Sequence, residues 1–256
     1  MSTVLASRGL AKRFAGITAL DHVDIEVEAG QRVGLVGPNG AGKTTLFNCL
    51  LGVTRCDAGT VEFDGEDITA LQVHERARRG IGRTFQRIEL FPGSTVRQHL
   101  LIADRTRHRT GRLWKDLIGL GGPRSDELTR CDEVLDMLGI GQLGDEPIER
   151  LSLGQGRLVE VGRALMTEPK LLLLDEPSSG LDRGETAALA QTLLEVQAHQ
   201  GFAILLVEHD IELVQSFTTY AYLLDFGVMV LDGTTDEVMR SDEMRKAYLG
   251  ELELPA

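Results

Sequence analysis

Eight consecutive residues near the N-terminus have the composition and spacing of a loop that binds phosphate groups. They fit the pattern G-x-x-x-x-G-K-[ST] without a mismatch, and they are Gly37, Pro38, Asn39, Gly40, Ala41, Gly42, Lys43 and Thr44. Glycines allow a backbone to wrap closely around phosphate oxygens, and the amides at a helix start supply partial positive charge. We therefore expect Lys43 to reach the β- and γ-phosphates of a nucleotide and Thr44 to place its hydroxyl on Mg²⁺.

Two adjacent carboxylates far downstream could complete such a site. The apolar run LLLL ends at Asp175, and Glu176 follows at once. A carboxylate at the end of a buried strand can hold Mg²⁺, usually through water, and the next one can act as a general base or orient the attacking water. Asp175 is therefore a predicted metal ligand, and Glu176 is a predicted catalytic residue.

The nucleotide is predicted to be ATP. A GTPase would be expected to carry Asn-Lys-x-Asp, but the asparagines are Asn39 and Asn48, and neither begins that motif. Phe14 is an aromatic residue near the N-terminus that could stack on adenine.

A second helix start with the character of an anion site is predicted in the segment LSLGQGRLVEVGRAL, Leu151 to Leu165. Ser, Gly and Gln make a short polar loop, and unpaired amides point outward at the helix start that follows. The helical pattern places apolar side chains on one side and Arg157, Glu160 and Arg163 on a charged side. One chain would thus carry two helix starts that bind phosphate.

The elements that must position these residues alternate between strand and helix. QRVGLVG ends directly in the phosphate loop, and the runs in PKLLLLDEP and GFAILLVEHD are typical of buried parallel strands. VLASRGL and HVDIEVEAG indicate strands, and hairpins are predicted with turns at Asp64-Gly65 and Phe226-Gly227.

Residues 104–127 are basic, Gly-rich and irregular, which favours a peripheral insertion. The basic run 74–80 is interpreted as a solvated helix face.

Composition excludes several classes of protein. The chain has 256 residues with a formal charge of −12 and no long basic tract, so no nucleic-acid partner is expected. Cys49, Cys56 and Cys131 form no CxxC pair, which fits a reducing compartment. The N-terminus lacks the apolar core of a signal peptide, and no apolar run approaches the roughly 20 residues that span a bilayer. We expect a soluble chain whose membrane partner would be a separate protein.

With these residues in place, nearly the whole chain resembles the ATPase subunits of ABC transporters. The matching motifs occur in order and at the right spacing. They are Phe14 at the base-stacking position, residues 37–45 as Walker A (Thr45 included), Gln86 in the Q-loop, Leu151-Ser152-Leu153-Gly154-Gln155 as the signature, residues 171–176 as Walker B, Ser179-Gly180-Leu181-Asp182 as the D-loop and His209 as the switch histidine.

The resemblance implies one α/β ATPase domain, residues 1–256, with the P-loop NTPase fold. Its RecA-like core would comprise 1–87 and 166–256, with an N-terminal antiparallel β subdomain and an inserted α-helical subdomain at 88–165. ATP and Mg²⁺ are the implied cofactors. Gln86 would touch Mg²⁺ and the attacking water and face the membrane subunits.

The resemblance also explains the second helix start. In the family two ATPase domains pair head to tail, so that Ser152, Gly154, Gln155 and the helix after them cap the γ-phosphate bound by the partner. The closed dimer would form with ATP and open without it, and His209 and Asp182 would take part in that closed state. Leu153 departs from the family pattern, because it stands where the signature has its first glycine.

Segments such as GRTFQRIELFPGSTVRQHLL and LLVEHDIELV are similar to the branched-chain amino-acid importer group. This similarity implies an ATPase dimer with a second, related ATPase, two permeases and an external solute-binding protein, at the cytoplasmic face of the membrane. Lipid or lipopolysaccharide export, urea or amide import, and a soluble ABC ATPase remain alternatives. A small-molecule kinase does not explain the signature, the D-loop or His209.

Overall fold

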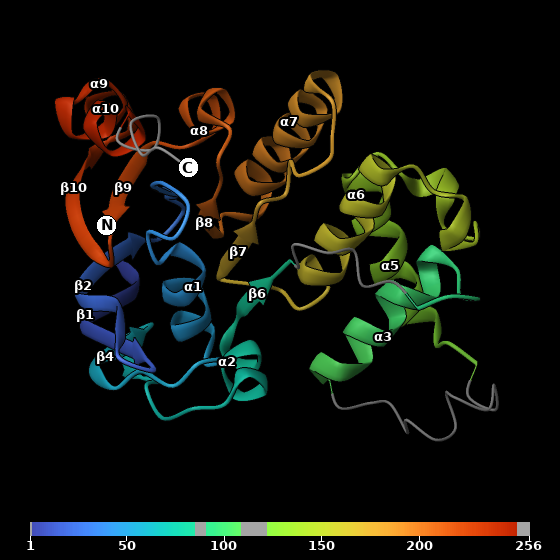
Figure 1. Ribbon diagram of the computed structural model, residues 1–256. Helices are drawn as coiled ribbons and strands as arrows, with labels where there is room; N and C mark the ends of the chain where they lie inside the picture. The colour runs from blue at the N-terminus through green and yellow to red at the C-terminus, as the bar shows by residue number, and fades with distance from the viewer. Residues whose placement is uncertain (1, 85–90, 109–121, 250–256) are drawn as a thin grey trace. The chain divides into compact units, whose positions relative to one another are not determined.

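The computed structural model describes residues 2–84, 91–108 and 122–249 (Figure 1). The chain divides into two compact units. The first contains residues 1–81, 170–176 and 201–256, and the second contains residues 82–169 and 177–200. The boundaries expected from the sequence, with a helical subdomain at 88–165, stay a prediction.

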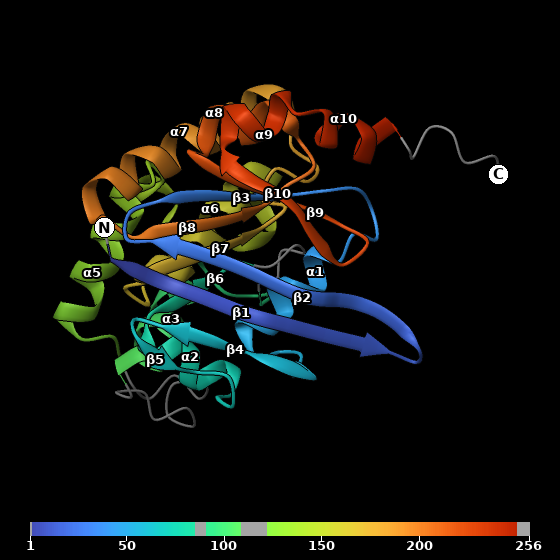
Figure 2. The ribbon, with the colours of Figure 1, turned by 90° about the vertical axis from the view of Figure 1, so that its left-hand side faces the viewer.

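The first unit contains an antiparallel sheet built by the N-terminal third of the chain. Its strands are β1 (Thr3–Phe14), β2 (Ile17–Glu28), β4 (Ala58–Phe63) and β5 (Glu66–Asp67), in the order β2-β1-β4-β5 (Figure 2). β1 and β2 are longer than the sequence segments indicated, because a tight turn at Ala15 and Gly16, both with positive φ, joins them directly. The Asp64-Gly65 turn between β4 and β5 is confirmed by the pairing of Phe63 with Glu66.

The second sheet carries the predicted buried strands. It contains β3 (Arg32–Val36), β6 (Ile81–Arg83), β7 (Leu171–Asp175), β8 (Ala203–Val207), β9 (Tyr220–Asp225) and β10 (Val228–Thr234), in the order β10-β9-β3-β8-β7-β6. β7, β8, β3 and β9 pair in parallel, and β10 returns antiparallel after the Phe226-Gly227 turn. The helices of this unit are α1 (Lys43–Leu51), α2 (Val73–Arg79), α8 (Ile211–Phe217), α9 (Thr235–Arg240) and α10 (Asp242–Leu249).

The main hydrophobic core joins both sheets to α1. The core includes buried side chains from five elements, which are Leu5 of β1, Ile25 of β2, Leu35 of β3, Phe47 of α1 and Leu205 of β8. Burial of both faces explains why β7 and β8 are continuous apolar runs without alternation.

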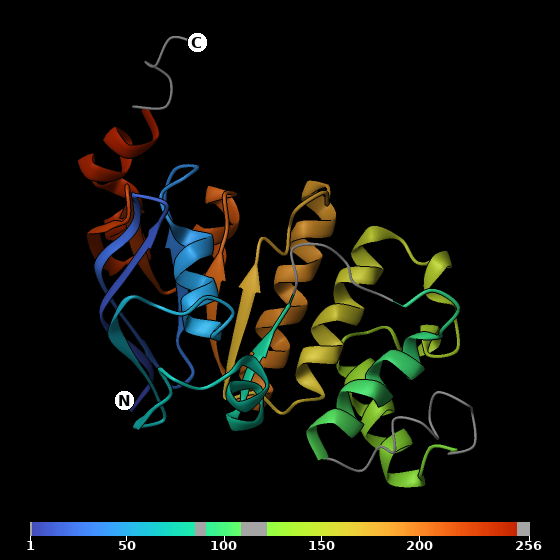
Figure 3. The ribbon, with the colours of Figure 1, turned by 60° about the horizontal axis from the view of Figure 1, so that its bottom comes forward.

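The second unit is helical in the part that the structure describes. Its helices are α3 (Val96–His108), α5 (Ser125–Met137), α6 (Leu153–Leu165) and α7 (Arg183–Gln200), with short 3-10 turns at Gly141–Leu143 and Ile148–Arg150 (Figure 3). No helix within residues 2–84, 91–108 and 122–249 is long and apolar enough to cross a membrane.

The interpretation of residues 104–127 as an irregular insertion is wrong at both of its ends. Asp104 lies inside α3 and is fully buried, and Arg130 of α5 donates to both of its carboxylate oxygens at 2.8 Å. Arg105 likewise pairs with buried Glu127 at 3.0 Å. These ion pairs join α3 to α5, and residues 109–121 lie outside the described residues.

The basic run 74–80 is also more than a solvated face. Arg76 is 3% exposed, and its guanidinium donates to the carbonyl oxygens of Cys49 and Leu50, at 2.9 and 2.7 Å, and of Thr69 and Leu71, at 2.9 and 3.1 Å. The last carbonyls of a helix have no intrahelical partner. Arg76 thus caps the C-terminal end of the helix that follows the phosphate loop.

Replacing Arg76 by alanine is expected to lower the free energy of unfolding by about 2–4 kcal/mol, because four buried carbonyls lose their donor. Arg78→Ala, at an exposed position of the same helix, should change it by only about 0.5 kcal/mol or less. Urea unfolding followed by circular dichroism measures both. Equal effects of the two substitutions would contradict the capping role.

Candidate nucleotide-binding site

The predicted catalytic segments of the first unit leave the same edge of the parallel sheet. In register, Leu35 of β3 and Asp175 of β7 both pair with Val207 of β8. Because the carboxyl ends of parallel strands meet at one edge, the phosphate loop, Glu176 and His209 emerge together there. This edge is where α/β sheets bind ligands.

The course of the phosphate loop requires glycine at two positions. Gly37 and Gly42 have φ of 150° and 107°. A Cβ on Gly37 would lie 2.0 Å from the carbonyl oxygen of Leu224, and one on Gly42 would lie 2.5 Å from that of Ala19. The loop therefore packs against neighbouring backbone more closely than any side chain permits.

α1 begins at Lys43 without a capping side chain or an acidic residue in its first turn. A helix start of this kind leaves its amides for an anion. Lys43 is 5% exposed, and its ammonium donates to the carbonyl oxygens of Gly37 and Pro38 at 2.5 and 2.8 Å. Its charge thus lies inside the loop, while Thr44 is exposed and Thr45 half-buried.

Glu176 and His209 are in direct contact. His209 Nε2 lies 2.8 Å from Glu176 Oε1, and the two side chains are 41% and 19% exposed. The Glu176 amide donates to Val207 O at 2.9 Å, and its φ is 46°, a conformation that non-glycine residues rarely adopt. The backbone therefore holds this carboxylate against the imidazole, a contact that the sequence did not predict.

Ser152 caps the predicted second helix start, in the other unit. Its Oγ accepts from the Gln155 amide at 3.2 Å, and Gln155 Oε1 accepts from the Ser152 amide at 2.9 Å. This reciprocal pair is a capping box, and α6 follows as predicted. The Ser152 hydroxyl hydrogen is still able to donate outward, and the side chain is exposed.

A family model described as ABC transporter matches residues 20–179. The chain belongs to the ABC transporter family. The match begins before the phosphate loop and ends within the D-loop, so it includes Walker A, the signature and Walker B.

Relatives extend the similarity over nearly the whole chain. BraF of Pseudomonas aeruginosa, a high-affinity branched-chain amino acid transport ATP-binding protein, is 36% identical over 251 residues, covering 97% of this chain and 98% of BraF. LptB of Haemophilus influenzae, a lipopolysaccharide export system ATP-binding protein, is 32% identical over 249 residues, covering 97% of this chain and 98% of LptB. The crystal structure of the ADP conformation of MJ1267, an ATP-binding cassette of an ABC transporter, has a TM-score of 0.86 at 30% identity, covering 98% of this chain and 100% of that one. The predicted ABC ATPase fold is confirmed, and the chain is an ATP-hydrolysing transporter subunit.

Phe14, the predicted base-stacking residue, lies outside the core and is 47% exposed. Lys12 Nζ is 5.2 Å from its ring centroid. Asp57 accepts from Lys12 Nζ at 2.9 Å and from the Arg13 amide at 2.8 Å. Asp57 thus orders the strand end that presents this aromatic ring.

Tyr248 of α10 is a site residue that sequence reasoning missed. Its hydroxyl accepts from the Gly37 amide and donates to the Gly37 carbonyl, both at 3.2 Å. The C-terminal helix therefore braces the first glycine of Walker A. No local signal predicts this contact, because a tyrosine in an amphipathic helix is most often a packing residue.

Leu153, the departure in the ABC signature, contacts the D-loop. A Cβ on Gly180 would lie 2.8 Å from Leu153 Cδ2, and the φ of Gly180 is 83°, so the loop turns closely over this leucine. Asp182 Oδ1 accepts from the Glu185 amide at 2.8 Å and thereby caps α7. The D-loop aspartate, predicted as a nucleotide-binding residue, has this helix-capping contact within its own unit.

The charged side predicted for the signature helix is largely buried. Arg157 and Glu160 are 5% and 3% exposed and pair at 3.4 Å. Arg157 also donates to the carbonyl oxygen of Ser179 at 3.2 Å. The pair fastens the D-loop to α6, which the helical period alone did not indicate.

Gln86, the predicted Q-loop glutamine, lies outside the described residues.

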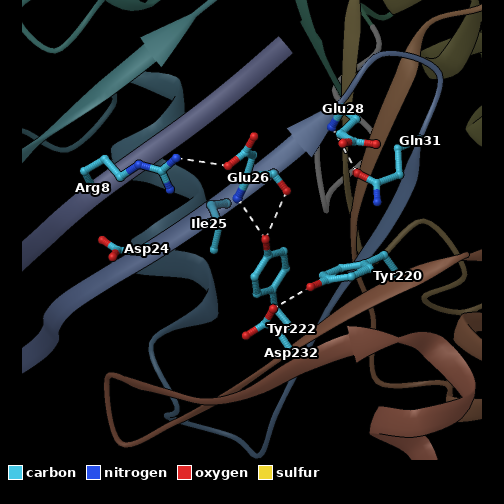
Figure 4. Close-up of a pocket in the computed structure, with 9 residues that line it drawn as sticks. All are labelled: Arg8, Asp24, Ile25, Glu26, Glu28, Gln31, Tyr220, Tyr222 and Asp232. Atoms are coloured by element: carbon cyan, nitrogen blue, oxygen red, sulfur yellow. Dashed lines mark hydrogen bonds and ion pairs between the residues drawn. The ribbon is translucent and has the colours of Figure 1, made fainter. Parts of the chain in front are cut away.

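A cavity of about 610 Å³ opens at the end of β3 remote from Walker A (Figure 4), and it is lined by Arg8, Asp24, Ile25, Glu26, Glu28, Gln31, Tyr220, Tyr222 and Asp232. Glu26 pairs with Arg8, and the Tyr220 hydroxyl donates to Asp232, so several of its charges are already engaged. It does not belong to the nucleotide site.

Proposed function

We propose that this chain hydrolyses ATP to power import of branched-chain or related hydrophobic amino acids through partner permeases. The observation that carries the proposal is the 36% identity to BraF over 97% of the chain. The chain itself contacts nucleotide and permease in this scheme, and the solute binds to other subunits.

The residues of Walker A bind the phosphates of ATP. Amides of Gly40 and Gly42 face the phosphate oxygens, Gly37 begins the loop with its amide held by Tyr248, and Lys43 turns from its loop carbonyls to the β- and γ-phosphates. The remaining loop residues, which are Pro38, Asn39, Ala41 and Thr45, shape the same cradle, and Phe14 stacks on the adenine.

The Mg²⁺ site is proposed from its donors. Thr44 offers a hydroxyl and Asp175 a carboxylate, and Gln86 would add an amide oxygen; oxygen donors are the ligands that Mg²⁺ prefers. Within the described residues no group of three or more His, Cys, Asp or Glu lies together to hold a metal. A site with only a few protein ligands suits Mg²⁺, because this ion takes its other ligands from phosphate and water. The bound ion would neutralise charge on the β- and γ-phosphates.

Hydrolysis is assigned to Glu176 with His209. The Glu176 carboxylate orients the attacking water and takes its proton. His209, whose Nε2 lies 2.8 Å from Glu176 Oε1 in this structure, moves away from the carboxylate to contact the γ-phosphate. The contact between them offers each side chain a hydrogen-bond partner before nucleotide binds.

The signature acts on the ATP of a partner ATPase. Ser152, the exposed cap of α6, would donate its hydroxyl hydrogen to the partner-bound γ-phosphate, together with the amide of Gly154, while Gln155 keeps its capping contact with Ser152. Asp182 lies in the D-loop that α6 holds through Arg157. The partner is proposed to be a second, related ATPase, and the pair sits at the cytoplasmic face of the membrane.

Ser152→Arg is expected to leave ATP affinity of the isolated chain within about twofold and to abolish ATP-dependent closure with its partner, because a bulky cation would fill the phosphate space. Analytical ultracentrifugation with and without ATP measures closure. Ser125→Arg, at the exposed start of α5, is the control and should close normally. Normal closure of the Ser152 variant would refute the cross-chain role.

The transport proposal is tested by purifying the tagged chain from native membranes in mild detergent and identifying its companions by mass spectrometry. Two polytopic permeases and a related ATPase are expected. The complex is then reconstituted with its binding protein, and ATP-dependent accumulation of radiolabelled leucine is measured, with the Glu176→Gln complex as the blank. Exclusive recovery of soluble proteins, or no leucine uptake, would overturn the proposal.

Export of a lipid or lipopolysaccharide is the second candidate, because LptB is 32% identical over a similar span. The same purification distinguishes the two. Export predicts a companion with a lipid-binding domain and ATPase stimulation by lipid A but not by leucine.

A further inference from the structure

One hydroxyl of the C-terminal helix spans two consecutive peptide planes of Walker A. Tyr248 lies in the last turn of α10, and its hydroxyl accepts from the Gly37 amide and donates to the Gly37 carbonyl oxygen, both at 3.2 Å. The amide belongs to the peptide plane before the Gly37 Cα, and the carbonyl belongs to the plane after it. The hydroxyl therefore fixes both backbone dihedral angles of a residue type that has more conformational freedom than any other.

The packing of α10 sets the position of this hydroxyl. Met244, Ala247 and Tyr248 are spaced i, i+3, i+4, so they share one face of the helix. Met244 is buried, and Ala247 and Tyr248 pack against the same core cluster, which includes Val36, the residue before Gly37. The contact with Walker A thus depends on the docking of the whole helix.

The Gly37 carbonyl oxygen also accepts from the Walker A lysine. Lys43 Nζ donates to it at 2.5 Å, so this buried carbonyl has two donors, the ammonium and the Tyr248 hydroxyl. In the proposed function, ATP draws Lys43 away to the β- and γ-phosphates, and the Tyr248 hydroxyl stays on the carbonyl. A buried carbonyl that loses its hydrogen bonds costs free energy.

We propose that Tyr248 is a positioning residue for ATP binding, and that docking of α10 thereby raises the affinity of Walker A for ATP. Without ATP, loss of the hydroxyl would leave Lys43 on the Gly37 carbonyl. With ATP bound, the same loss would take away both of these donors. The hydroxyl therefore stabilises the ATP-bound state more than the free state, and a difference of this kind is what raises an affinity.

The coupling works in both directions and rests on the proposed function. The net contribution of one hydrogen bond corresponds to about a two- to tenfold change in an equilibrium constant. By linkage, bound ATP strengthens the docking of α10 by the same factor as the docked helix strengthens ATP binding. The contact with the Gly37 amide is present in both states, so it adds stability without changing the affinity.

Tyr248→Phe tests the positioning role, because it removes the hydroxyl and keeps the ring. A fluorescent ATP analogue measures affinity in the full chain, where we expect binding to weaken by about two- to tenfold. In the purified complex the KM for ATP should rise by the same factor, and kcat should stay within about twofold, since loss of uniform binding raises KM alone. Tyr220→Phe is the matched control. It removes a hydroxyl that donates to Asp232 in the cavity remote from Walker A, and it should leave affinity and KM unchanged.

Thermal unfolding distinguishes positioning from simple anchoring of the helix. Saturating ATP should raise the unfolding midpoint less in Tyr248→Phe than in wild type, because ligand stabilisation follows the affinity. Hydrogen exchange of the α10 amides should slow with ATP in wild type, and the variant should lose most of this difference.

Equal ATP affinity in Tyr248→Phe and wild type would overturn the inference, even if the variant unfolds at a lower temperature. ATP-independent exchange of α10 in wild type would overturn the coupling. A wild-type chain that binds no ATP would instead overturn the proposed function, and the inference with it.

Discussion

Replacing Glu176 by glutamine is expected to reduce ATP turnover by about 10²–10⁴-fold, because a positioned general base contributes a factor of that order. Glutamine has nearly the same shape and can still accept a hydrogen bond from His209, but it cannot take a proton from water. The backbone at Glu176, with its φ of 46°, is unchanged by the substitution. ATP binding should therefore persist, and the ATP-bound dimer should accumulate because hydrolysis no longer opens it.

Phosphate release measures the turnover, and size-exclusion chromatography with ATP measures the trapped dimer. Glu168→Gln is a matched control, since Glu168 is an exposed glutamate with a φ of 48°. It undergoes the same loss of charge at the same backbone conformation and should hydrolyse ATP at the wild-type rate. Wild-type turnover by the Glu176 variant would show that another group activates the water.

Replacing Lys43 by methionine is expected to weaken ATP binding by about 10–100-fold, since hydrogen bonds to a charged group contribute roughly 1.5–3 kcal/mol. Methionine keeps much of the apolar stem in this buried position but removes the ammonium. Donation to Gly37 O and Pro38 O is lost as well, so the loop also loses an internal support.

Titration with a fluorescent ATP analogue measures the affinity. Thermal unfolding without nucleotide separately measures the stability that the Lys43 contacts give to the loop. Lys170→Met, which removes an exposed lysine paired with Asp64, should leave affinity unchanged, because surface pairs contribute little. ATP affinity equal to wild type in the Lys43 variant would contradict the assignment of Walker A.

The sequence alone determined the features that depend on short-range chemistry. Walker A requires glycine where φ is positive and the backbone is crowded, so its pattern can be recognised in the sequence without knowledge of the fold. The apolar runs of β7 and β8, the turns at Asp64-Gly65 and Phe226-Gly227 and the cap at Ser152 are local for the same reason. From these, the α/β architecture and the positions of Glu176 and His209 after parallel strands could be predicted.

Only the tertiary structure decided which side chains meet. Helical period places Arg76 on a charged face, but burial against the end of α1 makes it a cap. Similarly, the helical period does not show that Arg157 reaches the D-loop or that Tyr248 braces Gly37. Each of these contacts joins residues from different elements, and local propensity contains no information about the partner. The phosphate loop was therefore predictable from sequence, whereas the groups that hold it in place are a property of the packed chain.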